Sequence, residues 1–227
     1  MSLADMIPAR LRQMPAYEHE KPVQVLEHEI GARIAQMDLN ENPFGPSRRA
    51  VEAIAARLQE VDRYPDDTGY YLRKKLAGSF NLSIDQVIIG VGSSDILTMA
   101  FQAFLDPDAE VLTSQGSFIV YYLLAATTGM RIVCTPLKDQ AFDLPAMAER
   151  LTPRTRLVII ANPNNPTGTI VRREEFDSFM EKVPQDVVVI MDEAYFEYVS
   201  DSQYPDSFEY LRSGKQVLIL RTFSKAY

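Results

Sequence analysis

The pattern of hydrophobic and polar positions divides the chain into a polar N-terminal stretch and a longer, more regular region. Residues 1 to about 35 are charged and interrupted by prolines, so we expect an arm outside the core. Two amphipathic helices are predicted next, one starting at Ser47 and one covering Tyr70–Phe80, because apolar residues recur at spacings of three and four. Their apolar positions are Val51, Ile54, Ala55 and Leu58 in the first helix and Leu72, Leu76 and Phe80 in the second.

From residue 86 onward, short runs of apolar residues alternate with helical patterns. The predicted strands are Gln86–Ile89, Glu110–Thr113, Arg131–Leu137, Arg156–Ala161, Val187–Met191 and Gln216–Leu220. The predicted helices are Ser94–Leu105, Phe118–Thr128, Leu144–Arg150 and Arg172–Glu181. Near-continuous apolar strands that alternate with helices indicate an α/β fold, with a largely parallel sheet sandwiched by helices. Ligands of such folds bind beyond the carboxyl ends of the strands, so candidate chemistry is expected there.

Composition and charge narrow the class of protein. With 227 residues, 46% of them hydrophobic, the chain can bury the core of one large domain, or of one domain and a fragment. A net charge of −8 argues against a nucleic-acid partner or an anionic membrane. The N-terminus lacks the apolar segment of a secretory signal, and no apolar run approaches the ~20 residues that span a bilayer. One cysteine and two histidines cannot form an ordinary zinc site, so we expect no metal, a buried structural thiol at Cys134 and a cytoplasmic protein.

The most informative segment follows the last predicted strand and covers Arg221–Tyr227. It puts Lys225 just past the end of a strand, where its amine can reach a ligand cleft. The alternative is a solvated lysine in a surface loop, which is the ordinary situation of an isolated lysine. Three other segments bear on this choice, because each of them also follows a predicted strand.

The first of these segments is a turn rich in glycine and serine, Gly90–Asp95. Its glycines permit a tight turn, and the helix that follows offers backbone amides and the hydroxyls of Ser93 and Ser94 to an anion. A dinucleotide fingerprint would need a third glycine where Asp95 stands, and no Gly-Lys-Ser/Thr follows. The turn therefore predicts a phosphate site for a smaller ligand, with simple turn and cap chemistry as the alternative.

The other two segments are a stiff loop and a buried acid. The loop Asn162–Thr169 contains two prolines, a glycine and several short amides, and loops held on a rigid scaffold commonly carry function. Asp192 ends a buried strand, where a lone carboxylate is costly unless a partner compensates for it. A cationic ring nitrogen would be a suitable partner, and a helix cap or a structural ion pair is the alternative. Tyr195 could bring a phenol to the same ligand.

Together these segments resemble the fold-type I pyridoxal-phosphate enzymes, specifically the class II aminotransferases of the histidinol-phosphate type. The matching motifs are LNENPFGPS (Leu39–Ser47), RYPD (Arg63–Asp66), GSSDIL (Gly92–Leu97), NPNNPTGT (Asn162–Thr169), DEAYFEYV (Asp192–Val199) and RTFSKAY (Arg221–Tyr227). The resemblance implies that residues 46–227 are the pyridoxal-phosphate-binding large domain and that residues 1–45 belong with a small domain. Members of the family continue past the lysine into a C-terminal small domain. We therefore expect the large domain to be incomplete and the 227 residues alone to be inactive.

The resemblance also implies a role for each candidate residue. Lys225 would hold pyridoxal 5′-phosphate as a Schiff base and transfer the proton at the substrate Cα, while Asp192 would pair with the ring nitrogen. Asn165 and Tyr195 would hydrogen-bond the 3′ oxygen of the cofactor. The other implied cofactor contacts are Ser93, Ser94 and Thr222 to the phosphate, Phe118 stacked on the ring, and Tyr64 from the partner subunit of a homodimer. Core packing of Phe118 and an ordinary loop position for Tyr64 are the alternatives.

The implied reaction moves an amino group between histidinol phosphate and 2-oxoglutarate in histidine biosynthesis. Relatives with the same lysine and aspartate transaminate aromatic amino acids or decarboxylate phosphothreonine, so these two residues do not separate the three activities. The LNENPFGPS and RYPD motifs favour the histidinol-phosphate branch by resemblance, and the absence of Trp disfavours an aspartate-type enzyme. A ligand sensor of the same fold would carry a basic extension, and a dinucleotide-binding domain would carry the third glycine. The chain shows neither feature.

Overall fold

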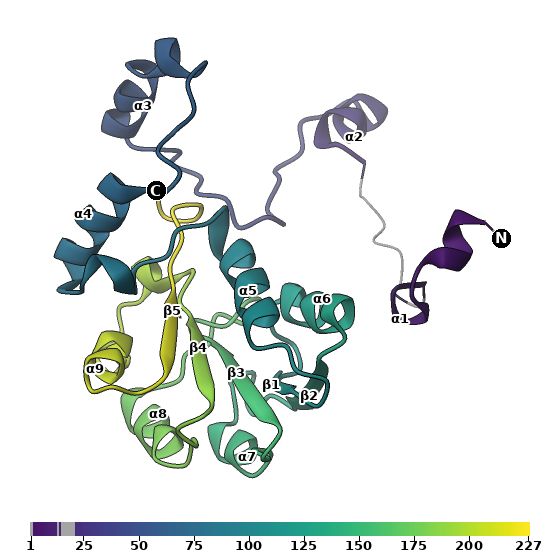
Figure 1. Ribbon diagram of the computed structural model, residues 1–227. Coiled ribbons are helices and arrows are strands. Elements are labelled where there is room, and N and C mark those ends of the chain that lie inside the picture. The colour runs from purple at the N-terminus through teal and green to yellow at the C-terminus, as the bar shows by residue number, and fades with distance from the viewer. Residues whose placement is uncertain (1, 13, 15–20) are drawn as a thin grey trace.

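The centre of the molecule is a sheet of parallel strands. The computed structural model describes residues 2–12, 14 and 21–227. In this part of the chain five strands pair in the order β2-β1-β3-β4-β5, all parallel (Figure 1). They are Glu110–Ser114 (β1), Arg131–Thr135 (β2), Thr155–Ala161 (β3), Val188–Asp192 (β4) and Val217–Leu220 (β5). The parallel sheet predicted from the apolar runs is confirmed.

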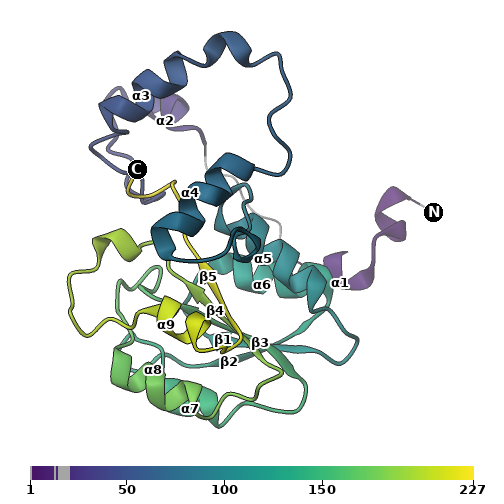
Figure 2. The same cartoon turned by 60° about the vertical axis from the view of Figure 1, so that its left-hand side comes forward.

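Helices cover both faces of the sheet, which explains why the central residues of the strands are mostly apolar. The covering helices are Gly92–Ala103 (α5), Ile119–Thr128 (α6), Leu144–Ala148 (α7), Arg173–Met180 (α8) and Ser207–Arg212 (α9). Helices α5 and α6 lie on one face, and α7, α8 and α9 lie on the other (Figure 2). Every residue of β1 is buried, and Leu157 to Ile160 of β3 are fully buried. The core therefore lies on both sides of the central strands.

The N-terminal part of the chain, up to Gln86, is not irregular throughout, although the described residues of the arm predicted over residues 1 to about 35 do lie outside this core. It contains Leu3–Met6 (η1), Ala9–Arg12 (α1), Val23–Ile30 (α2), Arg48–Ala55 (α3), Leu58–Glu60 (η2), Tyr70–Phe80 (α4) and Ile84–Gln86 (η3). Helices α1 and α2 have no buried residues, and α2 projects away from the sheet (Figure 1). Helix α3 begins where the sequence predicted, and Ser47 caps it, because its hydroxyl accepts a hydrogen bond from the Ala50 N–H at 3.2 Å.

The strand predicted over Gln86–Ile89 is wrong. Val87 is extended, with φ −115° and ψ 123°, but no strand pairs with it in the described part of the chain. Its carbonyl accepts a hydrogen bond from Arg73 Nε at 2.8 Å instead. An apolar cleft of about 250 Å³ has residues of this segment and of β5 among its lining. An apolar run favours extended structure but does not encode the neighbour that a strand needs.

The expectation for Cys134 needs a smaller correction. Cys134 lies on β2, an edge strand, and its side chain is half-buried rather than fully buried. Partial burial still raises the pKa of its thiol. No helix in the described residues is long and apolar enough to cross a bilayer.

Candidate functional site

The carboxyl ends of the strands open into a cleft of about 480 Å³. The strand register makes Ala161, Asp192 and Leu220 neighbours on β3, β4 and β5. Two backbone hydrogen bonds continue this register past the strand ends, from Asn162 N–H to Asp192 O at 2.9 Å and from Glu193 N–H to Leu220 O at 3.0 Å. The three loops that the sequence singled out therefore leave the sheet side by side.

Most of the candidate residues line this one cleft. Those that do are Ser93, Phe118, Asn165, Asp192, Tyr195, Thr222 and Lys225. Ser94 lies in the first turn of α5 but not among the lining residues, and its carbonyl accepts a hydrogen bond from Thr98 Oγ1 at 2.8 Å. Tyr64 lies between η2 and α4, fully exposed and away from the cleft of its own chain. The structure thus brings together seven candidates and leaves two outside.

Asp192 is a buried acid whose charge is only partly compensated. Tyr121 Oη donates to Asp192 Oδ2 at 2.6 Å, and the Ala194 N–H donates to Oδ1 at 3.3 Å. Burial raises the pKa of Asp192, while these two hydrogen bonds act in the opposite direction. The structural ion pair considered for this carboxylate is absent among the described residues. The arrangement leaves room for a cationic group of a ligand.

Hydrogen bonds hold the side chain and the backbone of Lys225 in the site. Its Nζ donates to the Leu39 carbonyl at 2.9 Å and lies 5.7 Å from the centre of the Tyr195 ring. The backbone around it is also held, because Tyr198 Oη donates to the Lys225 carbonyl at 3.0 Å. The next carbonyl, of Ala226, accepts from Asn42 Nδ2 at 3.3 Å. These contacts disfavour the solvated-loop alternative for Lys225.

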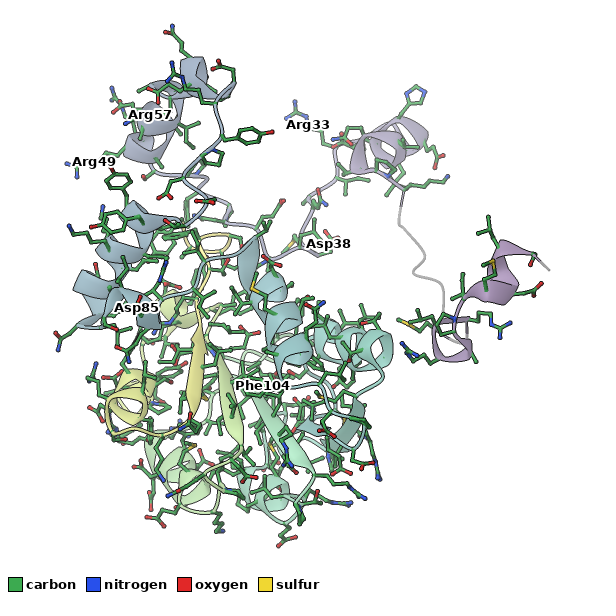
Figure 3. The ribbon with its side chains drawn as sticks, viewed as in Figure 1. Arg33, Asp38, Arg49, Arg57, Asp85 and Phe104 are labelled. Carbon is green, nitrogen blue, oxygen red and sulfur yellow. The ribbon has the colours of Figure 1, made fainter. Side chains whose placement is uncertain are left out.

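The phenol of Tyr195 accepts hydrogen bonds from two amides. Asn165 Nδ2 lies 3.4 Å from its oxygen, and Asn40 Nδ2 lies 3.0 Å from it. Asn40 has φ 52°, a left-handed conformation that asparagine tolerates better than most residues. The sequence argument did not select Asn40, although the LNENPFGPS motif contains it. Asp38, which also lines the cleft, is on the same segment (Figure 3).

One end of the cleft is suited to an anion. Helix α5 begins at Gly92, and the first N–H groups of a helix have no acceptor within the helix. The turn before it favours glycine, because Gly92 has φ +75° and a Cβ on Gly90 would lie 2.7 Å from Asp95 Oδ2 and 2.9 Å from Ile96 Cδ1. Ser93 and Thr222 line the same cleft from two different segments, and Thr222 Oγ1 shares a hydrogen bond of 2.8 Å with Ser224 Oγ. This end therefore offers backbone and hydroxyl donors. Asp95, in the first turn of α5, is not among the lining residues, and its Oδ2 accepts a hydrogen bond from the Val91 N–H at 3.0 Å.

A buried ion pair supports the loop that carries Lys225. Arg221 Nε donates to Glu193 Oε2 at 2.6 Å, and the Glu193 side chain is fully buried. The Arg221 guanidinium also stacks 3.4 Å from the ring centre of Phe196, which belongs to Phe196–Tyr198 (η4). Burial raises the pKa of Glu193, and Arg221 opposes that rise. The pair fixes the residues after β4 against those after β5.

The chain matches one protein-family model and similar proteins of known name. The family model described as Aminotransferase class I and II matches residues 33–227. Histidinol-phosphate aminotransferase 1 of Idiomarina loihiensis is 38% identical over 224 residues, covering 98% of this chain and 61% of that protein. Histidinol-phosphate aminotransferase 2 of Pseudomonas fluorescens is 42% identical over 220 residues, covering 96% of this chain and 60% of that protein. The chain spans about three fifths of the length of these curated relatives.

A solved structure gives the same picture for the fold. The crystal structure of histidinol-phosphate aminotransferase from Sinorhizobium meliloti in complex with pyridoxal-5′-phosphate has a TM-score of 0.85 and 28% sequence identity to the chain. The match covers 97% of this chain and 59% of that one. This likeness confirms the predicted architecture, an α/β large domain with a parallel sheet sandwiched by helices.

Proposed function

This chain belongs to the class I and II aminotransferases, and from that premise we propose that the whole protein transfers an amino group between histidinol phosphate and 2-oxoglutarate, with pyridoxal 5′-phosphate as cofactor. The observation that carries the proposal is that Asp192 and Lys225 line one cleft, where the buried Asp192 carboxylate has no cationic partner among the described residues. The names of the two relatives at 38% and 42% identity support the substrate. Because these relatives are named histidinol-phosphate aminotransferases, we propose a role in histidine biosynthesis. We also propose that the protein acts in the cytoplasm.

The residues of the cleft fit this cofactor. A protonated pyridine nitrogen would supply the positive charge that Asp192 lacks among its described neighbours. The hydroxyls of Ser93 and Thr222 and the first amides of α5 suit a phosphate, and we propose that Ser94 contributes from the same turn. The ring of Phe118 lines the cleft and suits stacking on the pyridine.

The catalytic roles follow from the positions of the polar groups. When bound, the cofactor supplies an electron sink that weakens the Cα–H bond of the substrate. Lys225 would hold the cofactor through Nζ and then carry the proton to and from the substrate Cα. Because the Asn40 and Asn165 amides both donate to Tyr195 Oη, the phenol proton remains available for the 3′ oxygen of the cofactor. Asp192 would keep the ring nitrogen protonated.

We also propose that two copies of the protein share their active sites. Helix α3 and the segment after it expose large apolar side chains: Val51 at 50%, Ile54 at 63%, Leu58 at 59% and Val61 at 76%. Tyr64 follows them, fully exposed, and its phenol would reach the cofactor phosphate of the other copy. An apolar face that ends in an unused phenol fits a second copy of the chain.

The substrate is tested on the full-length protein loaded with pyridoxal 5′-phosphate. Histidinol phosphate, phenylalanine and phosphothreonine are added separately, and the cofactor absorbance and the product are followed. We expect rapid conversion to the amino form of the cofactor with histidinol phosphate, and glutamate once 2-oxoglutarate is added. Conversion mainly with phenylalanine, or carbon dioxide release from phosphothreonine, would move the protein to one of the alternative activities.

The role of Lys225 is tested by substitution and by chemical trapping. Lys225→Ala should lower kcat/KM by at least about 10²–10⁴-fold, because it removes the group that moves the proton. Borohydride reduction followed by peptide mass analysis should find the cofactor on Lys225 in the wild type. Lys215→Ala is the matched control, since Lys215 Nζ bonds to the Met180 carbonyl away from the cleft. Cofactor trapped on another lysine would refute the assignment.

A further inference from the structure

Tyr121 contacts two of the groups that we propose to hold the cofactor ring, although it was not among the predicted site residues. It lies in the first turn of α6 and is fully buried. Its Oη donates to Asp192 Oδ2 at 2.6 Å, across 71 positions of sequence. Its ring packs edge-on against Phe118, with ring centres 5.7 Å apart and an interplanar angle of 87°.

The two oxygens of the Asp192 carboxylate have different hydrogen-bond partners. The phenol occupies Oδ2 at a distance typical of a strong O–H···O⁻ bond. Among the described residues, Oδ1 accepts only the longer bond of 3.3 Å from the Ala194 N–H. Oδ1 is therefore the oxygen left for a ligand nitrogen, and the phenol fixes the carboxylate plane in which that nitrogen must lie.

The ring contact orients a second proposed element of the site. Phe118 precedes the first turn of α6, so it and Tyr121 are three positions apart on one side of the helix. An edge-to-face contact restricts the tilt of the Phe118 ring. One side chain thus touches both the in-plane partner of the cofactor ring and the ring that would stack on it.

We propose that Tyr121 is a positioning residue that sets the orientation of Asp192 and Phe118 toward the cofactor ring, an inference that rests on the function proposed above. The alternative is that Tyr121 only packs in the hydrophobic core and has no effect on the cofactor site. The two differ in the hydroxyl group, because packing needs the ring whereas positioning of the carboxylate needs Oη. The other ionisable groups that act on this pair are Tyr122 and Tyr195, which act on Tyr121, and Tyr204, which acts on Asp192, and Lys225 shares the cleft.

The test removes this hydroxyl and keeps the ring. Tyr121→Phe is compared with Tyr122→Phe, a matched control whose lost hydroxyl donates to the Ser114 carbonyl at 2.6 Å. The first measurement uses the full-length protein without cofactor and follows the Asp192 carboxyl by NMR with ¹³C-labelled aspartate. Tyr121→Phe should raise the pKa of Asp192 by about one unit, because the anion loses its strongest hydrogen bond. Tyr122→Phe should leave it unchanged.

The second measurement uses the loaded protein. Tyr121→Phe should weaken pyridoxal 5′-phosphate binding about tenfold, the same factor as one pKa unit, and should move the ¹⁵N shift of the pyridine nitrogen toward its unprotonated value. Fluorotyrosine at position 121 keeps the shape and strengthens the donor, so it should lower the pKa of Asp192. This variant decides the question if Tyr121→Phe does not fold.

The outcomes separate the two proposals. An unchanged Asp192 pKa in both position-121 variants would overturn the positioning role, whether or not the cofactor binds. A wild-type protein that does not bind pyridoxal 5′-phosphate would overturn the proposed function instead. A shifted pKa without any change in cofactor affinity or ¹⁵N shift would refute the link between Tyr121 and the cofactor ring.

Discussion

Replacing Arg221 by Gln should destabilise the fold by about 3–5 kcal/mol, because it leaves a buried carboxylate without its cation. The Glu193 side chain is 0% exposed and that of Arg221 is 21% exposed, so solvent screens the pair weakly. The unpaired carboxylate can instead take a proton. Protonating a glutamate with an ordinary pKa of 4.5 costs about 3 kcal/mol at pH 7. This cost agrees with the expected destabilisation of about 3–5 kcal/mol.

The assay is urea unfolding of the protein without cofactor, so that ligand binding does not contribute. Arg212→Gln is the control, because its partner Asp206 lies 3.1 Å away and both side chains are about 40% exposed. We expect this exposed pair to contribute less than about 1 kcal/mol. The double substitution Glu193→Gln/Arg221→Gln should recover part of the loss, because the buried Glu193 charge is removed together with its cation. Recovery should be incomplete, because Glu197 Oε1 lies 3.9 Å from Arg221 and also loses its cationic neighbour.

The pH dependence of the free energy of unfolding gives a second test of this prediction. Burial raises the folded-state pKa of Glu193, and loss of Arg221 would raise it further. A raised carboxyl pKa lowers stability as the pH increases through that pKa, because the folded state must then give up a proton it holds more tightly than the unfolded state. The difference between wild type and Arg221→Gln should therefore be smallest in acid and grow toward neutral pH. A loss no larger than that of Arg212→Gln, or one independent of pH, would refute the reasoning.

Two further predictions concern the segments outside the sheet. Gly69→Ala should cost about 1–3 kcal/mol in urea unfolding, because Gly69 has φ +59° and a Cβ would lie 1.9 Å from Ile89 Cδ1. Gly45→Ala, at φ +68° with open space around it, should cost less, and equal losses would contradict the clash. Tyr64→Ala should lower activity about tenfold or more without changing unfolding, as expected if its phenol serves another copy. Mixing it with inactive Lys225→Ala subunits should restore activity, and failure to do so in a proven mixed dimer would count against shared sites.

The sequence predicts the sheet well because its strands are buried on both faces, so each appears as an apolar run that ends in a polar residue. Asp192 and Lys225 were found for this reason: both stand at or just past such an end. The Gln86–Ile89 segment has the same apolar character but no neighbouring strand in the described residues, and nothing local distinguishes the two cases.

The contacts within the site were harder to predict because they join distant positions. Tyr121 lies in a helix that is apolar on most of its surface, and its partner Asp192 is 71 positions away. Asn40 and Tyr195 are 155 positions apart. Glu193 and Arg221 each follow a strand that the sequence predicted, but only the parallel register of β4 and β5 makes them a pair.

The segment that carries Leu39 and Asn40 has a consequence for the order of folding. Its bonds to Lys225 and Tyr195 close loops of 186 and 155 positions, whereas each strand of the sheet pairs over much shorter separations. Closing a longer loop costs more entropy, so these bonds should form after the sheet is assembled. During synthesis the segment with Leu39 and Asn40 leaves the ribosome first. Its hydrogen bond to Lys225 can form only after Lys225 has also been synthesised. We therefore expect the cleft to form after the sheet, so that ligand binding reports the last step of folding.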